Sequence, residues 1–190
     1  MDSGFDERRS QTRIGNALVM TKPIVNKVAQ SALITFDLEE HIPQGPRTFI
    51  DLSQWLEEGF LLRENAFREA LKRHNWAQYQ DQHIALDCTS DAIVPAWASL
   101  LVAAYLQPYV QTLVLGDLID LERKLFSDGI AAMELAPYQN KPIIIKGCSD
   151  PSIPKDAYIQ LILRLQGVAK SLFYGEACSS VPLWKAKKVR

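Results

Sequence analysis

The chain has 190 residues, with 21 lysine and arginine residues against 22 aspartate and glutamate residues, and a formal net charge of −1 at pH 7. This length suits a single domain, and the balanced charge argues against a general binder of nucleic acid or another polyanion, which would usually be strongly basic. No apolar run approaches the ~20 residues of a membrane-spanning helix, and the first residues are too polar for a secretory signal. Three cysteines, an odd number, cannot form a complete set of disulfides, so a cytoplasmic protein is expected.

The first part of the chain is expected to contain an extension and a cap. Residues 1–22 begin with charged and polar side chains, and we interpret them as a flexible N-terminal extension before one α/β domain over residues 23–190. Residues 23–75 have irregular patterns, and we interpret them as an α+β cap that packs on a face or an edge of the main sheet. The cap is predicted to contain strands at Ala32–Phe36 and Thr48–Ile50 and helices at Ser53–Glu58 and Glu64–Arg73.

An internal repeat organises the rest of the chain. Residues 76–117 align without a gap to residues 135–176, shifted by 59 positions, with 12 identities in 42 residues. Each copy is predicted to run strand, helix, strand, and each helix follows a proline, Pro95 or Pro154, whose fixed φ suits a first turn. An amphipathic helix is predicted between the copies. The expected strands are His83–Asp87, Thr112–Leu115, Pro142–Lys146 and Ser171–Tyr174, and the expected helices are Ala96–Leu106, Leu118–Met133 and Lys155–Leu165.

Strands that alternate with helices indicate an open parallel sheet, because right-handed connections place helices on both of its faces. We therefore predict a Rossmann-like, doubly wound α/β fold in which all strands of the repeat share one sheet. The simplest order of these strands, numbered along the repeat, is 2-1-3-4. In such sheets ligands bind at the carboxyl ends of the strands, where the crossovers diverge.

The two repeat helices carry different side chains on one equivalent face. The second copy has the polar residues Asp156, Gln160 and Arg164 at a spacing of four, which is typical of a solvent-facing stripe. The equivalent residues of the first copy are Trp97, Leu101 and Tyr105. This apolar face must be covered, either by the N-terminal third of the chain, which we favour, or by a second subunit that uses it as a partner surface.

The three cysteines are expected to lie at the carboxyl edge of this sheet. Cys88 and Cys148 follow neighbouring strands of the predicted order, at the same structural point of each copy, and Cys178 comes just after the last strand. Three thiolates with a carboxylate or histidine could bind zinc or anchor iron. The long spacings match no standard C-x-x-C pattern, so buried structural cysteines or a reactive thiol are the alternatives.

Carboxylates accompany these cysteines at the same edge. Asp91 and Asp150 each follow a serine shortly before a helix, so a capping or turn role is favoured over a metal ligand. Asp117 and Glu176 end the return strands and could ligate a metal or hold a substrate. Among the histidines, His41 is the one that could reach a metal from the cap.

A nucleotide cofactor is not expected. The first strand-to-helix turn, residues 88–95, contains no glycine, and the chain has neither a G-x-x-x-x-G-K-S/T loop nor a G-x-S-x-G elbow. Without glycine, the backbone cannot approach a pyrophosphate closely. A small anion at a helix N-terminus is the alternative.

Four passages form a specific combination of residues: Ser31–Glu39, Asp91–Pro95, Lys146–Ser149 and Tyr174–Leu183. Over about residues 24–188 they resemble an uncharacterised bacterial family, the domain of unknown function 2480. The resemblance implies a small cytoplasmic protein, and the genes of such proteins often lie near the sulfur-mobilisation machinery for iron–sulfur cluster assembly. It implies no particular activity.

These observations lead to one functional hypothesis and two alternatives. The hypothesis is a metal- or thiol-dependent accessory factor of iron–sulfur cluster or metal homeostasis, with Cys88, Cys148 and Cys178 as zinc or iron ligands and iron–sulfur assembly proteins as partners. The first alternative is a hydrolase or transferase of small molecules, with Cys88 or Cys148 as nucleophile in the same crevice. The second is a homodimeric binding module. The sequence does not decide whether the protein is an enzyme, and neither a membrane nor nucleic acid is expected as a partner.

Overall fold

The computed structural model describes residues 33–41, 43–147, 150–176 and 178–187. The chain divides into two units, Met1–Ser31 and Ala32–Arg190, and the second unit contains the fold. The predicted flexible extension, residues 1–22, lies outside the described residues, and so does Cys148. The predicted start of the domain at residue 23 therefore stays a prediction.

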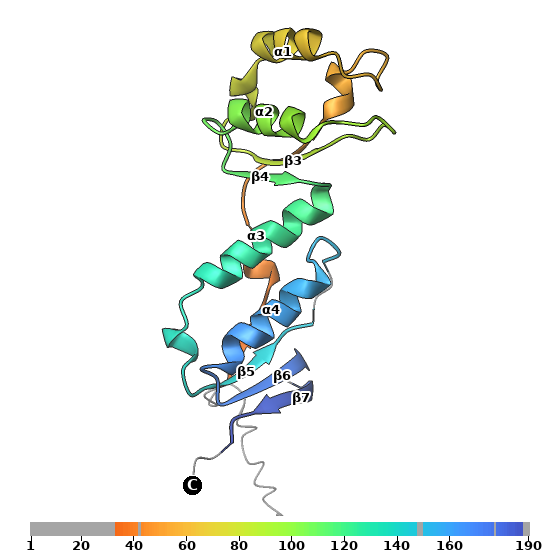
Figure 1. The fold of residues 1–190 in the computed structure, drawn as a ribbon. Coiled ribbons are helices and arrows are strands. Elements are labelled where there is room, and N and C mark those ends of the chain that lie inside the picture. The colour runs from red at the N-terminus through yellow and green to blue at the C-terminus, as the bar shows by residue number, and fades with distance from the viewer. Residues whose placement is uncertain (1–32, 42, 148–149, 177, 188–190) are drawn as a thin grey trace, which may run out of the picture. The chain divides into compact units, whose positions relative to one another are not determined.

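Strands and helices alternate over most of the described residues, which confirms the mixed α/β class (Figure 1). The strands are β1 (Ile34–Phe36), β2 (Arg47–Asp51), β3 (His83–Asp87), β4 (Thr112–Leu115), β5 (Pro142–Ile145), β6 (Ser171–Glu176) and β7 (Ser179–Lys185). The α-helices are α1 (Glu64–Arg73), α2 (Ala96–Leu106), α3 (Leu118–Ala132) and α4 (Lys155–Gln166). The predicted helix at Ser53–Glu58 is a 3₁₀ turn at Leu52–Trp55, and β7 has no counterpart among the predicted elements.

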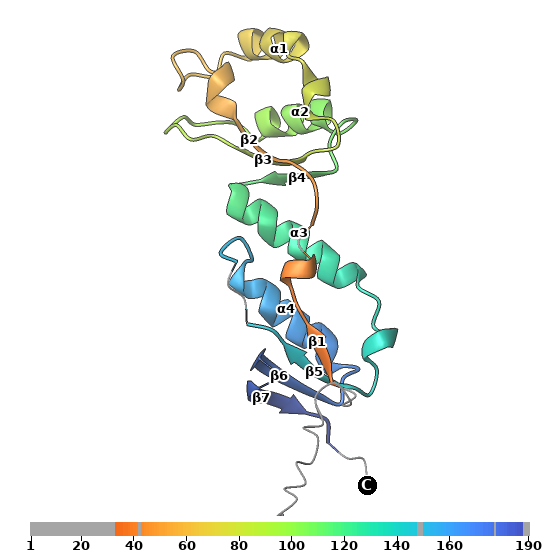
Figure 2. The same ribbon diagram turned by 180° about the vertical axis from the view of Figure 1, so that it is seen from behind.

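The strands form two sheets rather than one (Figures 1 and 2). β2, β3 and β4 form a parallel three-stranded sheet in that order, while β1, β5, β6 and β7 form a four-stranded sheet in which β7 is antiparallel. The strands of the repeat do not share one sheet, so the predicted order 2-1-3-4 is wrong and the doubly wound arrangement is not confirmed. The physical reason is that β2 pairs with β3 along the edge that the prediction assigned to β5.

The N-terminal segment adds one strand to each copy of the repeat. β2 places Ile50 beside Leu86 of β3, and β1 places Phe36 beside Ile145 of β5. Leu86 and Ile145 are equivalent under the shift of 59 residues, so β1 and β2 occupy equivalent positions as well. Their sequences agree with this, since the residues around them read ITFDL for β1 and TFIDL for β2. The predicted cap is thus partly a component of the sheets.

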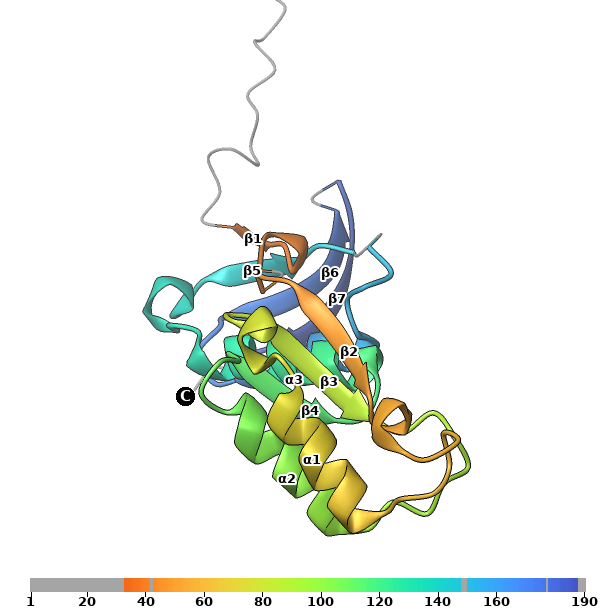
Figure 3. The ribbon, with the colours of Figure 1, turned by 90° about the horizontal axis from the view of Figure 1, so that it is seen from above.

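The three-stranded sheet has helices on both faces (Figures 1 and 3). On one face, α1 and α2 pack over β2 and β3. On the other face, Leu121 and Leu125 of α3 pack against Ala85. The buried side chains on the first face include Ile50, Ile84, Leu86, Phe67, Leu71, Val102 and Leu106.

The apolar face of α2 is covered by the N-terminal third of the chain, as predicted. Trp97 meets Phe67 of α1 edge-on, with 5.9 Å between ring centroids, and Tyr105 stacks on Trp76 at 5.3 Å. Leu101 packs against the same cluster. These residues therefore take part in intramolecular packing, while a dimer or partner surface that includes them stays a prediction.

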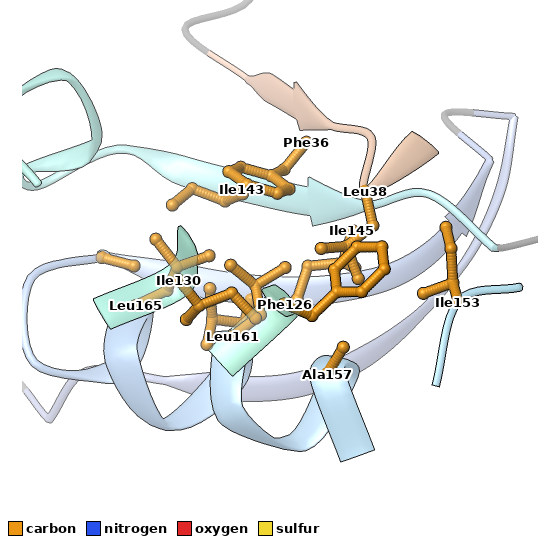
Figure 4. Close-up of a cluster of buried hydrophobic side chains, with 12 residues drawn as sticks. Phe36, Leu38, Phe126, Ile130, Ile143, Ile145, Ile153, Ala157, Leu161 and Leu165 are labelled. Atoms are coloured by element: carbon orange, nitrogen blue, oxygen red, sulfur yellow. The ribbon is translucent and has the colours of Figure 1, made fainter. Parts of the chain in front are cut away.

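The core of the four-stranded sheet lies between its strands and the helices α3 and α4 (Figure 4). Leu161 and Leu165 of α4 and Phe126 of α3 pack in one cluster with Ile143 and Leu172. α3 thus contributes buried side chains to both sheets, which joins the two copies into one structure.

The polar stripe of α4 contacts α3. Asp156 lies 3.7 Å from Nε of Arg123, and Gln160 donates a hydrogen bond to Asp156. Arg164 donates to the carbonyl oxygen of Ala131 at 2.8 Å. The predicted solvent face is therefore partly an interhelical contact, because the helix between the copies lies alongside α4.

Candidate functional site

The predicted cysteine site is not assembled among the described residues. Cys88 follows β3 of the three-stranded sheet and is half-buried, whereas Cys178 is exposed in the turn between β6 and β7 of the four-stranded sheet. Within the described ranges, no three histidine, cysteine, aspartate or glutamate side chains form a group that could hold a metal. Cys88 and Cys178 therefore do not lie on the edge of one sheet, as was predicted for them. Their role as zinc or iron ligands stays a prediction, since Cys148 is not described.

Cys88 takes part in local structure. Its amide donates to Oδ1 of Asp87 at 2.8 Å, and its Sγ lies 3.3 Å from Oγ of Ser90. Its side chain packs against the buried cluster beside α2. The shift of 59 residues pairs Cys88 with Gly147 rather than with Cys148, so the two cysteines are not at equivalent positions of the aligned repeat.

Asp51, at the end of β2, anchors the loop that follows β3. Its Oδ1 accepts the amides of Ser53 at 2.9 Å and Thr89 at 3.2 Å, and its Oδ2 accepts the hydroxyl of Thr89. Burial alone would raise the pKa of Asp51, but the hydrogen bonds from Thr89 and Ser53 outweigh burial and lower this pKa to about 2. The carboxylate therefore holds two segments of the edge together in its ionised form.

Asp37 takes the equivalent position at the end of β1. Its Oδ2 accepts a hydrogen bond from Nζ of Lys146 at 2.6 Å, and its Oδ1 accepts the amide of Glu39 at 3.0 Å. The hydrogen bond from Lys146 is the main cause that lowers the pKa of Asp37. Neither Asp37 nor Asp51 is among the residues predicted for a site. The signal that could have found them is the aspartate-leucine pair repeated in ITFDL and TFIDL.

The other predicted carboxylates include two with local structural roles. Asp117 caps α3, because its side chain accepts two amides of the first turn. Asp150 accepts the amide of Ser152 at 2.8 Å, a hydrogen bond that lowers the pKa of Asp150, so the predicted turn role is confirmed. Asp91 lies in the loop before α2, and Glu176 ends β6 with its side chain exposed.

His41 borders a small apolar cavity. Its ring stacks on Phe36 with 4.5 Å between centroids, and its Nδ1 lies 2.9 Å from the carbonyl oxygen of Asp37. The cavity has a volume of about 120 Å³ and is also lined by Leu38 and Phe126. Stacking and a backbone contact account for the position of His41, and its reach to a metal stays a prediction.

A cavity of about 860 Å³ lies where β6 and α4 of the second copy meet α3, and we call it the second-copy cavity. It opens at the carboxyl end of β6 and the N-terminus of α4, which is where ligands bind to parallel sheets. Its lining residues are Ile119, Arg123, Asp150, Pro151, Ile153, Pro154, Lys155, Asp156, Tyr158 and Tyr174.

The charged part of the second-copy cavity surrounds the start of α4. Pro154 precedes this helix and provides no side-chain hydrogen bond to its first amides, which carry the partial positive charge of the helix dipole. Lys155 adds a full positive charge, and Arg123 lies within 3.7 Å of Asp156. With Asp150, the lining contains two basic and two acidic side chains.

The aromatic part of the second-copy cavity consists of two tyrosines. Tyr158 of α4 and Tyr174 of β6 meet edge-on with 6.1 Å between ring centroids, and Tyr174 is 40% exposed. A Cβ atom added at Gly147 would lie 3.5 Å from the Tyr174 hydroxyl, so the loop after β5 lies against this ring. The first copy has Ser99 and Leu115 at the equivalent positions, so the aromatic wall is specific to the second copy.

Comparison with known proteins agrees with the resemblance seen in the sequence. The model of a family described as Protein of unknown function (DUF2480) matches residues 22–186. The chain belongs to this family. No curated protein and no solved structure matches the chain.

Membership of the DUF2480 family confirms the expectation drawn from the four sequence passages, over nearly the same residues. The description of the family names no activity, so it supports neither a metal site nor a thiol or iron–sulfur role. Among the described residues, no helix combines the length and the apolar content that crossing a membrane requires.

Proposed function

We propose that this DUF2480 protein binds, in the second-copy cavity, a small organic molecule with a single anionic group such as a carboxylate. The observation that carries the proposal is an opening of about 860 Å³ at the carboxyl end of β6, directly at the N-terminus of α4. Cavities of roughly 300–1,000 Å³ that combine apolar walls with a few polar groups are typical of small-molecule sites.

The start of α4 supplies the anionic subsite. The helix has 12 residues, and its aligned peptide dipoles place about half a positive elementary charge at this end. Pro154, the residue before the helix, provides no side-chain cap for its first amides, and Lys155 is the first residue of the helix. A carboxylate at this point would accept hydrogen bonds from the amides and would be attracted by Lys155 and Arg123.

The acidic side chains limit the charge of the ligand. Asp150 and Asp156 balance Lys155 and Arg123. A ligand with several negative charges, such as a nucleoside triphosphate, would therefore meet repulsion as well as attraction. A single carboxylate, or a zwitterion whose amine faces one of the aspartates, fits the balance better.

The aromatic wall suits the uncharged part of the ligand. Tyr174 is 40% exposed and Ile119 is 58% exposed, so both still have apolar surface to cover. Each square ångström of apolar surface that binding removes from water contributes about 25 cal/mol. A molecule of amino-acid size with an aromatic or branched side chain matches this combination of surfaces.

The proposal describes an accessory binding protein, with a hydrolase or transferase at the same crevice as the enzymatic alternative. A role in iron–sulfur cluster or metal homeostasis, with Cys88, Cys148 and Cys178 as thiols, is a separate hypothesis. It does not depend on ligand binding in the second-copy cavity.

Calorimetric titration with four probes tests the proposed ligand class. Phenylacetate offers a ring and a carboxylate, phenylalanine adds an amine, phenethylamine lacks the carboxylate, and pyrophosphate lacks the ring. We expect phenylacetate and phenylalanine to bind. Phenethylamine should bind about tenfold more weakly or not at all, because losing a hydrogen bond to a charged group costs about 1.5 kcal/mol or more. Pyrophosphate should also bind weakly, because it lacks the ring and its charges meet Asp150 and Asp156.

Exchanging residues between the copies gives matched variants for this titration. Lys155→Ala and Tyr174→Leu insert the first-copy residues Ala96 and Leu115, and each should weaken binding about tenfold while the fold persists, because both side chains are exposed. Lys124→Ala removes an exposed cation of α3 outside the cavity and should leave binding unchanged. Equal affinity in the wild type and Lys155→Ala, or a preference for pyrophosphate, would contradict the proposal.

A further inference from the structure

Apolar side chains project from the carboxyl edge of the three-stranded sheet. A groove of about 360 Å³, which we call the first-copy groove, lies between the segment of residues 60–62 and the loop before α2. Of the residues that line it, Phe60 is 57% exposed, Leu61 is 44% exposed and Ile93 is 94% exposed. Single exposed apolar side chains are common on proteins, but a group of them around one groove marks a docking surface.

A hydrogen-bonded turn holds Phe60 and Leu61 in this exposed position. Glu57 and Leu61 form an antiparallel bridge, with N···O distances of 2.9 and 3.0 Å in the two directions. Between them, Gly59 has φ +79° and Glu58 has φ +51°, and the second value is uncommon for a residue with a side chain. Because the turn already fixes these residues, less conformational entropy is lost when a partner covers them.

One carboxylate lines the first-copy groove, and others belong to the segments next to it in the chain. Asp91 lines it, Glu58 is exposed in the turn, and Asp87 is exposed at the end of β3. Glu57 is paired with Arg63, and the described residues that line the groove include no lysine or arginine. The groove therefore has an apolar lining and a rim that includes two exposed carboxylates, Asp91 of its lining and Glu58 of the adjoining turn.

We propose that the first-copy groove docks a segment of another protein in which apolar side chains are flanked by lysine or arginine. The apolar side chains of the partner would cover Phe60, Leu61 and Ile93, and its cations would meet the carboxylates of the rim. A symmetric pairing of two such grooves is disfavoured, because it would bring Asp91 and Glu58 of both copies together. This surface is independent of ligand binding in the second-copy cavity.

Titration of the full-length protein with two synthetic peptides tests the proposal. One is an amphipathic helix-forming peptide of leucine and lysine, and the other has glutamate in place of every lysine. We expect the leucine–lysine peptide to bind and its affinity to fall as salt is added, since salt screens the exposed charges. The leucine–glutamate peptide should bind about tenfold more weakly or not at all.

Point variants locate the peptide on the surface. Ile93→Ser introduces the residue type that the second copy has at the equivalent position, Ser152. Phe60→Ser removes the exposed aromatic ring of the turn. Each should weaken binding about tenfold. Asp91→Lys should reverse the preference between the two peptides. Leu163→Ser removes a side chain of α4 that is 66% exposed, and as the matched control it should leave binding unchanged.

Three results would overturn the proposal. The first is that the wild type and Ile93→Ser bind the leucine–lysine peptide equally well. The second is that the control Leu163→Ser loses as much binding as Ile93→Ser. The third is an absence of binding by the leucine–lysine peptide. In that case, a molecular mass that rises with protein concentration in the wild type but not in Ile93→Ser would identify a second copy as the occupant instead.

Discussion

The two copies of the repeat have the same scaffold and differ at the edge where their strands end. Each copy supplies two parallel strands and a helix and receives one strand from the N-terminal segment, so β2-β3-β4 and β1-β5-β6 are equivalent. Buried positions keep the same chemistry, as Leu86 and Ile145, or Val102 and Leu161, show. Both copies thus have buried apolar side chains at equivalent positions of their cores.

The side chains at the carboxyl edges of the two sheets differ in polarity and size. Equivalent residues of the first and second copies are Ile93 and Ser152, Ala96 and Lys155, and Leu115 and Tyr174. The first edge carries an apolar groove with a negative rim, while the second carries a larger cavity with balanced charges and an aromatic wall. A core substitution costs stability, whereas an exposed edge residue can change without disturbing the packing. One scaffold can thus carry two edges with chemically different surfaces.

The largest effect on stability is expected from truncating core side chains at equivalent positions of the two copies. Leu161→Ala should lower the free energy of unfolding by about 3 kcal/mol, and Val102→Ala by about 2 kcal/mol because fewer buried methyl groups are lost. Urea unfolding followed by circular dichroism measures both changes. Since α3 packs on both sheets, we expect one cooperative transition in each variant.

Leu163→Ala, at an exposed position of α4, is the control for Leu161→Ala and should change stability little. Two separate transitions, one sensitive to Leu161→Ala and the other to Val102→Ala, would show that the copies fold as independent units.

The second expected effect concerns the stability of the first copy in acid. The pKa of Asp51 is about 2 in the folded protein, and an unfolded aspartate has a pKa of about 3.9. Because the folded pKa is the lower one, the carboxylate stabilises the fold above about pH 4, and this stabilisation is lost as the pH falls to about 2. The difference corresponds to at most about 2.5 kcal/mol, which solvent exposure reduces to about 1–2 kcal/mol.

Asp51→Asn should therefore be less stable than the wild type at pH 7 and should lose less stability between pH 4 and pH 2, as measured by urea unfolding at each pH. Thr89→Val removes the hydroxyl that donates to Asp51 and should have a smaller effect in the same direction. Glu64→Gln breaks an exposed ion pair with Arg68 and serves as the control. An acid profile of Asp51→Asn identical to that of the wild type would show that Asp51 does not anchor this edge.

The sequence predicts the individual elements well because their signals are short-range. The apolar runs of β3 and β5 and the prolines before α2 and α4 depend on neighbours within a few residues. β7 is missing from the predicted elements because it contains Pro182, which interrupts a strand pattern. A proline is tolerated there because β7 lies at the edge of its sheet, where an amide donor is not required.

The pairing of the strands is a long-range property, and the sequence pattern leaves it open. Whether β3 pairs with β2 or with β5 depends on packing between segments far apart in the chain, and both choices satisfy the rule of right-handed connections. The similarity of ITFDL and TFIDL is a further signal, since it indicates one N-terminal strand for each copy and places Asp37 and Asp51 at equivalent edges. The second-copy cavity depends on how α3 lies against α4, which no residue spacing predicts.

The smallest expected effect is that of Cys88 on metal content, and it tests whether the two edges share a set of ligands. A zinc site needs three or four ligands around one ion, and the sequence-based hypothesis takes them from Cys88, Cys148 and Cys178. Cys88 and Cys178 follow strands of different sheets, and Cys88 already contacts Ser90. We therefore expect Cys88→Ser to keep whatever zinc or iron the wild type holds when both are purified without chelators and examined by elemental analysis. Loss of about one equivalent of metal in both Cys88→Ser and Cys178→Ser would instead show that the ligand set predicted from the sequence is correct and that it joins the two sheets.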